Sequence, residues 1–389
     1  SQSACARLSC LSQPSSRPIV GLVEQPARKH ERAPMLLVLA VSAAAILLVK
    51  ESILDSPREA PGSETSADRT IRIQGSTADP PLESRAFETS RRQLSDRFTL
   101  YQTRRFAVLS DAGVDWTRHQ AERLERAHHQ FHRWAEHMNL NPGPLRHKLV
   151  AILFAKQDDY AQFASQYEGV DELWMCGFYS PRNDRLVFYD IESSPHLKQA
   201  RSKLERIDDR LSNLAERREQ VKHDERRNAN VHTQQRLQAF ERQKQRESER
   251  LEQYVTRMST STTIHEAIHQ LLFHTGIQSK RMRYPLWLSE GIATSFETAK
   301  PNQAFGPGHE YEPRRRRFLE HLAADRLIPL KDFIVTLNVP RDENKVDVLY
   351  HQSYALVTWM NRFRDDELIE YLRQMQEQCG NRSAADYRK

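Results

Sequence analysis

The sequence has few cysteines, and none of them is spaced like a metal-binding pair. Its 389 residues include four cysteines, and no two of them form a CxxC motif. Four cysteines are too few for a disulfide scaffold, and the missing CxxC argues against zinc bound by cysteine. The sequence therefore indicates neither a disulfide-rich fold nor a zinc finger.

Modules for nucleic-acid binding are also missing. The net charge is +6 and the pI is about 9.1, a balance that can suit nucleic acid or an anionic membrane. No aromatic-basic module accompanies this charge, so we expect a basic surface and no nucleic-acid partner. The mean hydropathy of −0.74 is low for a compact enzyme, which indicates that part of the chain is a solvated tether or an exposed helix.

Long apolar runs are absent except at residues 35–50, which follow a basic N-terminal segment, residues 1–34. Arg28, Lys29 and Arg32 precede the run, as they would on the cytoplasmic side of a membrane anchor or export signal. No small-residue cleavage site follows it. We therefore favour a single anchor that holds the rest of the chain outside the cytoplasm. A cleaved signal of a secreted protein and a buried core helix are the alternatives.

Residues 51–95 are polar and lack apolar periodicity, so they are predicted to be a flexible linker. A folded domain is predicted over 96–389, with strands at 105–110 and 148–154 and helices at 115–138 and 157–167. Residues 177–190 place two β-rich runs around a Pro/Asn/Asp turn, which is typical of a β-hairpin. Helical periodicity returns at 316–324 and 353–375.

Residues 197–259 differ from the rest of the domain, because leucines and aromatics recur every three or four positions among Arg, Lys, Glu and Gln. This spacing predicts two helices that meet near residues 228–230 as an antiparallel helical hairpin inserted into the domain. The hairpin is either an arm that binds a protein partner or a solvated structural insertion.

A metal-binding pattern follows the predicted hairpin. The letters HEAIH place His265 and His269 four residues apart in an apolar helical pattern, so both imidazoles can reach one ion from the same helix face. Glu266 lies beside the metal's open position, where a general base is needed. The second apolar helix, WLSEGIA, supplies Glu290 as a third ligand, twenty-one positions after His269. Two histidines and one carboxylate leave the fourth position of Zn²⁺ to water, as in catalytic sites.

HEAIH followed by WLSEGIA resembles the gluzincins, a class of zinc metallopeptidases. The chain is most similar to their peptidase MA-like domains and to a related uncharacterised bacterial family, over residues 100 to 385. The resemblance implies that His265, His269 and Glu290 bind zinc and that Glu266 is the general base. Glu297 matches an acidic position that supports a ligand histidine in aminopeptidase-like members; a surface carboxylate is the alternative.

The expected fold is α+β, with a zincin-like mixed sheet packed on an active-site helix, a helical C-terminal part and the inserted hairpin. The expected function is zinc-dependent hydrolysis of a peptide or protein substrate. Tyr350 and Tyr354 are candidates to stabilise the oxyanion, although either could belong to the core. A non-catalytic membrane-anchored scaffold with a vestigial or structural zinc site and a zinc hydrolase for non-peptide substrates are the alternative functions.

Overall fold

The computed structural model describes residues 70–72, 79–170, 176–221, 227–280, 282–340 and 342–381. The basic segment, the apolar run at 35–50 and much of the predicted linker lie outside these residues. Among the helices that are described, none has both the length and the apolar character needed to cross a bilayer. Membrane attachment through the apolar run and a location outside the cytoplasm therefore stay predictions.

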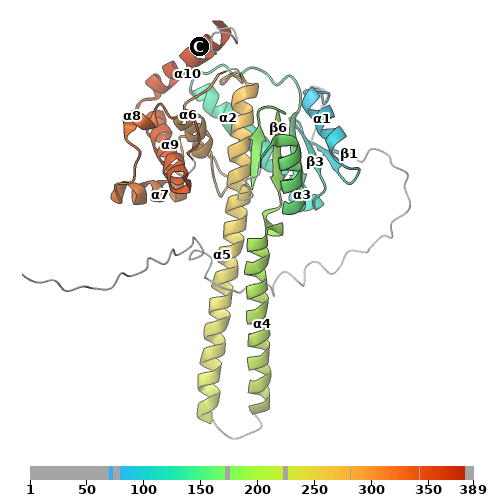
Figure 1. The fold of residues 1–389 in the computed structure, drawn as a ribbon. Helices are drawn as coiled ribbons and strands as arrows, with labels where there is room; N and C mark the ends of the chain where they lie inside the picture. Colours follow the sequence, from blue (N-terminus) through green and yellow to red (C-terminus); the bar gives the residue numbers. More distant parts are fainter. Residues whose placement is uncertain are drawn as a thin grey trace, which may run out of the picture. The chain divides into compact units, whose positions relative to one another are not determined.

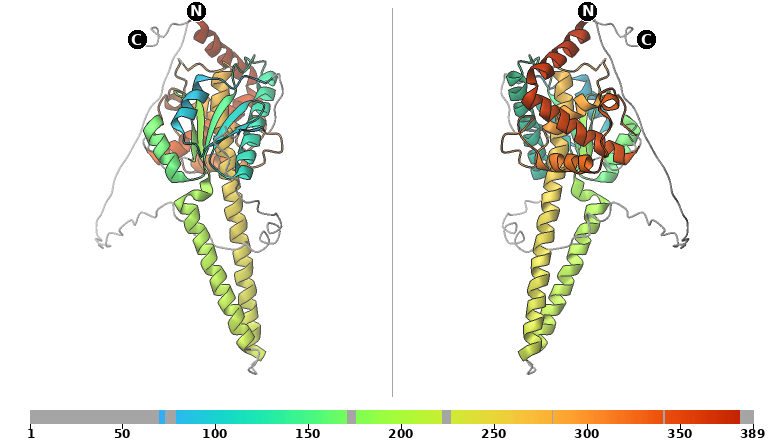
Figure 2. Two further views of the ribbon diagram at one scale, coloured as in Figure 1. Left: turned by 90° about the vertical axis from the view of Figure 1, so that its right-hand side faces the viewer. Right: turned by 90° about the vertical axis from the view of Figure 1, so that its left-hand side faces the viewer.

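Six strands form one mixed sheet in the order β1-β2-β3-β4-β6-β5 (Figures 1 and 2). They are β1 (Thr70–Arg72), β2 (Thr99–Gln102), β3 (Phe106–Ser110), β4 (Leu149–Phe154), β5 (Gly177–Ser180) and β6 (Arg185–Tyr189). The pairs β2/β3 and β5/β6 are antiparallel, and the others are parallel. The two predicted strands are confirmed as β3 and β4, and the predicted hairpin as β5 and β6. This arrangement leaves β5 at an edge of the sheet.

Both faces of the sheet are covered by helices. Along β3 and β4 the side chains alternate, so that Val108 and Leu153 enter one core and Leu109 and Ile152 enter another. Helices α2 (Val114–His137) and α5 (Arg227–His274) complete the first core. Helices α1 (Arg85–Gln93) and α3 (Gln157–Phe163) complete the second core, so the metal-binding motif of α5 packs on the first face only.

Helix α1 corrects the predicted linker, because it lies inside residues 51–95. Ser84 caps the helix by accepting a hydrogen bond from the Phe87 amide at 3.1 Å. Ser90 and Gln93 of α1 then bind the fully buried guanidinium of Arg185. This polar stretch folds through tertiary contacts, which local apolar periodicity does not reveal.

The inserted helical hairpin is present as α4 (Pro195–Val221) and α5, which run side by side (Figure 1). Its seam buries Leu204 and Leu237 and pairs Lys244 with Asp208. Helix α4 ends at Val221 and α5 begins at Arg227, so residues 228–230, where the two helices were predicted to meet, fall inside the first turn of α5. Helix α5 also continues through residue 259 without a break. The second arm of the hairpin and the metal-binding helix are therefore one helix of 48 residues.

The C-terminal part is helical, as predicted. It contains α6 (Leu286–Ser295), α7 (Glu312–Ala323), α8 (Leu330–Phe333), α9 (Glu343–Phe363) and α10 (Asp365–Asn381). The predicted helix at 353–375 is two helices, because the chain breaks at Arg364 between α9 and α10. A short π-helical turn (Ala164–Glu168) and a 3₁₀ turn (Ile191–Ser193) complete the described elements. The mixed α+β class is confirmed.

Candidate metal centre

Helix α5 presents His265 and His269 on one face, one turn apart. The helix is held rigidly here, because its neighbouring apolar side chains are fully buried against α2 and the sheet: Ile264, Ala267, Ile268, Leu271 and Leu272. The Nε2 atoms of the two histidines lie 3.2 Å apart. Two imidazole nitrogens at this distance can share one hydrogen bond or bind one cation between them.

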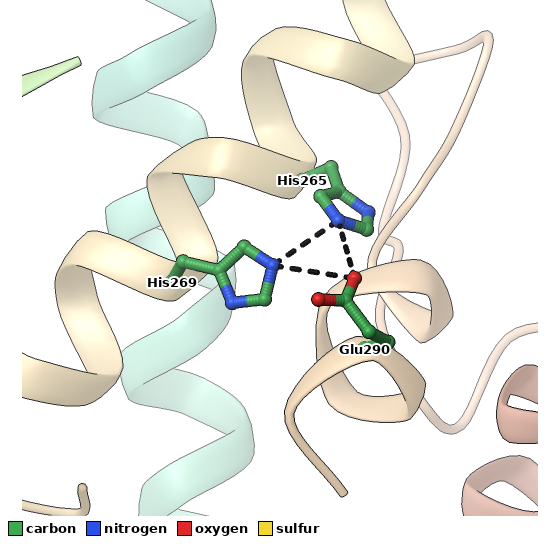
Figure 3. A group of neighbouring side chains, drawn as sticks. All are labelled: His265, His269 and Glu290. Atoms are coloured by element: carbon green, nitrogen blue, oxygen red, sulfur yellow. Dashed lines mark hydrogen bonds and ion pairs between the residues drawn. The ribbon is translucent and has the colours of Figure 1, made fainter. Parts of the chain in front are cut away.

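Helix α6 brings Glu290 to the same point. Its Oε2 atom lies 3.1 Å from Nε2 of His265 and 3.5 Å from Nε2 of His269 (Figure 3). Ligand atoms bound about 2.0–2.1 Å from a tetrahedral zinc ion lie about 3.3–3.4 Å apart. The three atoms therefore have the spacing of three corners of a zinc tetrahedron, and the donor set of two imidazoles and one carboxylate suits Zn²⁺.

Glu297 orients His265 from the side opposite the ligand atoms. Its Oε1 atom lies 3.0 Å from Nδ1 of His265, and both side chains are almost completely buried. In the tautomer that leaves Nε2 able to bind a metal, Nδ1 carries the proton and donates a hydrogen bond to Glu297. This contact fixes the tautomer and the ring plane, as carboxylates do beside zinc-bound histidines. The alternative of a surface carboxylate is wrong, because only 6% of Glu297 is exposed.

The electrostatics of the cluster favour a cation. Burial lowers the pKa of His265, but hydrogen bonds to Glu290 and Glu297 outweigh that effect and raise the pKa to about 10. Burial raises the pKa of Glu290, yet the neighbouring histidines bring it well below its usual range. In the same way, the charge of Arg314 and the bond to His265 outweigh burial and lower the pKa of Glu297 to about 2. The buried carboxylates thus stabilise a positive charge on His265, a charge that a bound divalent ion could replace.

Glu266 lies between the metal ligands and the edge strand of the sheet. Its Oε2 atom accepts a hydrogen bond from the backbone amide of Tyr179 in β5 at 2.8 Å. Burial raises the pKa of the Glu266 carboxyl, as a general base that must take up a proton requires. The contact also joins α5 to β5, which pairs with β6 alone among the described strands.

The two candidate tyrosines have different surroundings. The Tyr350 ring stacks on the His265 ring, with centroids 6.1 Å apart and planes 19° apart. The negative charge of Glu290, followed by burial, raises the pKa of the Tyr350 phenol well above its usual value. The Tyr354 hydroxyl accepts a hydrogen bond from the Tyr311 amide at 2.9 Å, which is a structural role in the loop before α7. Of the two tyrosines, Tyr350 lies against a candidate ligand, whereas Tyr354 lies against the loop before α7.

Close packing of α6 on α9 sets the position of Glu290. A Cβ atom on Gly291 would lie 2.7 Å from the Ser353 carbonyl oxygen and 2.5 Å from a methyl group of Val357. Glycine at this position lets the two helix backbones approach each other, and it places Glu290 against the end of α5. The glycine after the glutamate in WLSEGIA thus has a packing function.

Sequence reasoning missed one residue of the site. Arg314 in α7 donates from Nε to Oε2 of Glu297 at 2.8 Å and from Nη2 to Oε1 at 2.6 Å. Its position in the run RRRR at 314–317 carries no signal that would separate it from three ordinary surface arginines. Only the fold shows that this arginine turns inward while Arg315 and Arg316 are exposed.

Comparison with known proteins adds one finding. Residues 259–379 match the model of a family described as "Protein of unknown function (DUF1570)". The matched segment contains the three candidate ligands, Glu266 and Glu297, and it ends within α10. No curated protein and no solved structure matches the chain.

Proposed function

We propose that the protein is a zinc-dependent peptidase with His265, His269 and Glu290 as metal ligands. The observation that carries the proposal is the convergence of three ligand atoms within 3.5 Å of one another, beside a fourth buried side chain, Glu266, that can act as a base. The likeness to the gluzincin pattern supports the same assignment. Zinc at such a site supplies Lewis-acid chemistry, which acidifies water and polarises a carbonyl group.

Glu266 performs the proton transfers of the proposed reaction. Its Oε2 atom is bound by the Tyr179 amide, so Oε1 is the oxygen that takes a proton from the attacking water. The water oxygen bonds to the carbonyl carbon, and the carboxyl group then delivers the proton to the leaving amine as the C–N bond breaks. A raised pKa suits a group that holds the proton between these two steps.

Strand β5 offers a binding surface for an extended peptide. Because the Tyr179 amide donates to Glu266 rather than to β6, Tyr179 faces the free edge of the sheet, and by the alternation of strands so does Gly177. An extended substrate could pair, as an added strand, with the backbone groups of this edge other than the Tyr179 amide, which Glu266 occupies. Its scissile carbonyl would then lie next to Glu266, which is why we favour a peptide over another substrate.

Tyr350 is positioned to donate a hydrogen bond to the oxyanion. A phenol is protonated at neutral pH, and the charge of Glu290 together with burial raises the pKa of Tyr350 further, so that it acts as a donor. The stacking on His265 holds the ring at the metal ligands. In this role Tyr350 stabilises charge that develops only during the reaction.

The test is metal content together with peptide cleavage, measured on the full chain. After chelation and reloading with Zn²⁺, we expect one ion per chain in both the wild type and Glu266→Gln, because the glutamine carbonyl can still accept from Tyr179. Cleavage of a peptide library should fall about 10²–10⁴-fold in this variant. Glu312→Gln is the control, since Glu312 is exposed on α7 and should cleave at the parental rate.

The outcomes separate the alternatives. Undiminished cleavage by Glu266→Gln would refute the assignment of the base. Stoichiometric zinc with no cleavage of any peptide would favour the scaffold or a non-peptide hydrolase. Failure of the wild type to bind zinc would refute the proposal that the protein is a zinc-dependent hydrolase.

A further inference from the structure

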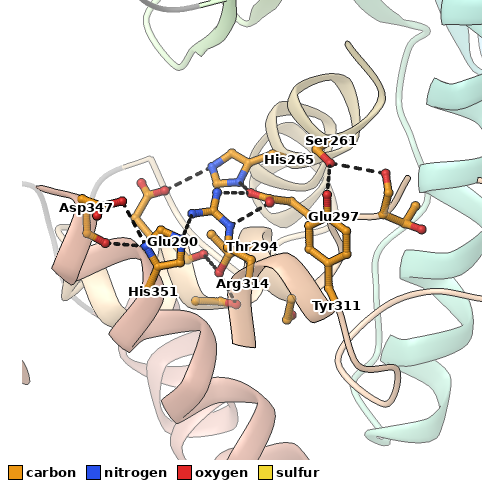
Figure 4. A network of polar contacts seen from close by, with 12 residues as sticks. Ser261, His265, Glu290, Thr294, Glu297, Tyr311, Arg314, Asp347 and His351 are labelled. Carbon is orange, nitrogen blue, oxygen red and sulfur yellow. Dashed lines mark hydrogen bonds and ion pairs between the residues drawn. The ribbon is translucent and has the colours of Figure 1, made fainter. Parts of the chain in front are cut away.

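A chain of buried polar contacts leads from the metal ligands into the C-terminal helices (Figure 4). It begins with His265 and Glu297 and continues to Arg314, which donates hydrogen bonds to both carboxylate oxygens of Glu297. Such paired bonds between a guanidinium and a carboxylate hold the carboxylate in one orientation. Without Arg314, Glu297 would be bound on one side only and could rotate.

Arg314 is itself held by α9. Its Nη1 atom lies 3.4 Å from Nε2 of His351, and its guanidinium lies 5.9 Å from the centre of the Tyr350 ring. Nδ1 of His351 is 2.6 Å from the Asp347 backbone carbonyl, so Nδ1 is the donor and Nε2 is left as an acceptor facing Arg314. The position of the guanidinium thus depends on the docking of α7 against α9.

His321, Asp347 and His351 are close enough together to suggest a second metal site, but their contacts argue against one. The Asp347 carboxylate already accepts two hydrogen bonds from Arg317, at 3.0 and 2.8 Å. The guanidinium groups of Arg314 and Arg317 would both repel a divalent ion, and Nδ1 of His351 is bound to a carbonyl oxygen. We therefore assign these side chains to the support of α7.

We propose that Arg314 is a positioning residue that sets the zinc affinity of the centre by fixing Glu297, and thereby His265, from helix α7. This inference rests on the proposed metal centre. Arg314 acts in two ways. It locks the carboxylate that orients the imidazole, and it compensates the charge of Glu297 beside the carboxylates of Glu290 and Glu266, so that the cluster stays assembled before the ion arrives.

The test measures zinc affinity of the full chain by competition with a chromogenic chelator, independently of turnover. Arg314→Gln should bind Zn²⁺ about 10–100-fold more weakly, the usual loss when a partner of a ligand histidine is removed. Arg314→Lys should recover part of the loss, because an ammonium can neutralise Glu297 but cannot bind both oxygens in one plane. Arg315→Gln is the matched control from the same run, since Arg315 is 54% exposed, and its affinity should be unchanged.

A double-mutant cycle separates positioning from general stability. If Arg314 acts through Glu297, then Arg314→Gln should cost much less affinity in a Glu297→Gln background than in the wild type. A merely structural role would give the same loss in both backgrounds, together with a parallel drop in the unfolding temperature of the metal-free proteins. That result would overturn the proposal.

The failures are distinguishable. If the wild type binds one zinc ion and Arg314→Gln binds it equally tightly, the role of Arg314 is refuted while the metal centre stands. If the wild type binds no zinc, the centre and the inference fall together.

Discussion

Gly291 gives the sharpest test of how helix packing determines the geometry of the metal site. It follows Glu290 in α6 and lies against the backbone of α9, where a Cβ atom would be 2.7 Å from the Ser353 carbonyl oxygen and 2.5 Å from Val357. Ordinary contacts of a Cβ atom begin at 3.4 Å. The change Gly291→Ala therefore demands that the two helices separate by about 0.7 Å at Ser353, because a backbone carbonyl in a helix cannot rotate aside.

Two opposing effects determine the expected magnitude. Overpacking a closely packed contact costs about 1–3 kcal/mol, whereas alanine is favoured over glycine within a helix by about 1 kcal/mol. Subtracting the second effect from the first, we expect a net decrease of about 0–2 kcal/mol in the free energy of unfolding of the metal-free protein. Because Glu290 is the adjacent residue, it should shift with α6 by a similar distance, and zinc affinity should fall as well.

The assay is denaturant unfolding in excess chelator and again in saturating Zn²⁺, combined with a zinc titration. Gly308→Ala is the control, because a Cβ atom at Gly308 would have no neighbour within 4 Å. The difference between wild type and Gly291→Ala should be larger with zinc than without it, since the displaced Glu290 also weakens binding to the folded state. A variant as stable as the wild type, with the same zinc affinity, would show that this contact does not position Glu290.

Two further predictions concern Tyr350 and Asp184. Tyr350→Phe should keep its zinc and lose about 10²–10³-fold in kcat, the usual effect of removing an oxyanion donor, whereas Tyr354→Phe should lose stability but little activity; equal effects on kcat would contradict the assignment. Burial raises the pKa of Asp184, but bonds to His274 and Lys280 outweigh it and bring the pKa well below its usual range. Asp184→Asn should therefore lower the free energy of unfolding by about 1–3 kcal/mol at pH 7. A carboxyl group with a lowered pKa stabilises the folded state at pH values above its unfolded-state pKa of about 4, and this stabilisation is lost as the pH falls below that value. The unfolding curves of the two proteins should therefore converge in acid. A difference in unfolding free energy between wild type and Asp184→Asn that stays constant with pH would contradict this prediction.

Strands β3 to β6 and the candidate ligand set were predictable because each has a strong local signal, whereas β1 and β2 were not predicted. Residues 149–154 of β4 are apolar without interruption, as a strand buried on both faces must be. The spacing of His265 and His269 is a property of one helix, so no tertiary information is needed to place them together. Glu290 required one further assumption, that the next apolar helix returns across the first, and the structure has that arrangement.

The remaining features depend on contacts between distant segments. Helix α1 is polar, and its order comes from Arg185, about ninety residues away. Arg314 is distinguished from its neighbours in the basic run only by the direction in which α7 docks. Tyr350 and Tyr354 are one helical turn apart and equivalent in sequence, yet one stacks on His265 and the other binds the Tyr311 amide.

The continuity of α5 explains how a long charged hairpin can be inserted next to the candidate metal centre without disturbing the arrangement of its side chains. The C-terminal turns of α5 are fixed by fully buried side chains such as Ile264 and Leu271, which set the rotation of the helix about its axis. Residues added on the N-terminal side lengthen the same helix away from the sheet, by about 1.5 Å each. They leave the register of His265 and His269 unchanged, because that register is determined where the helix packs. The hairpin can therefore vary in length or bind a partner while the metal geometry is set by α2, α6 and the sheet.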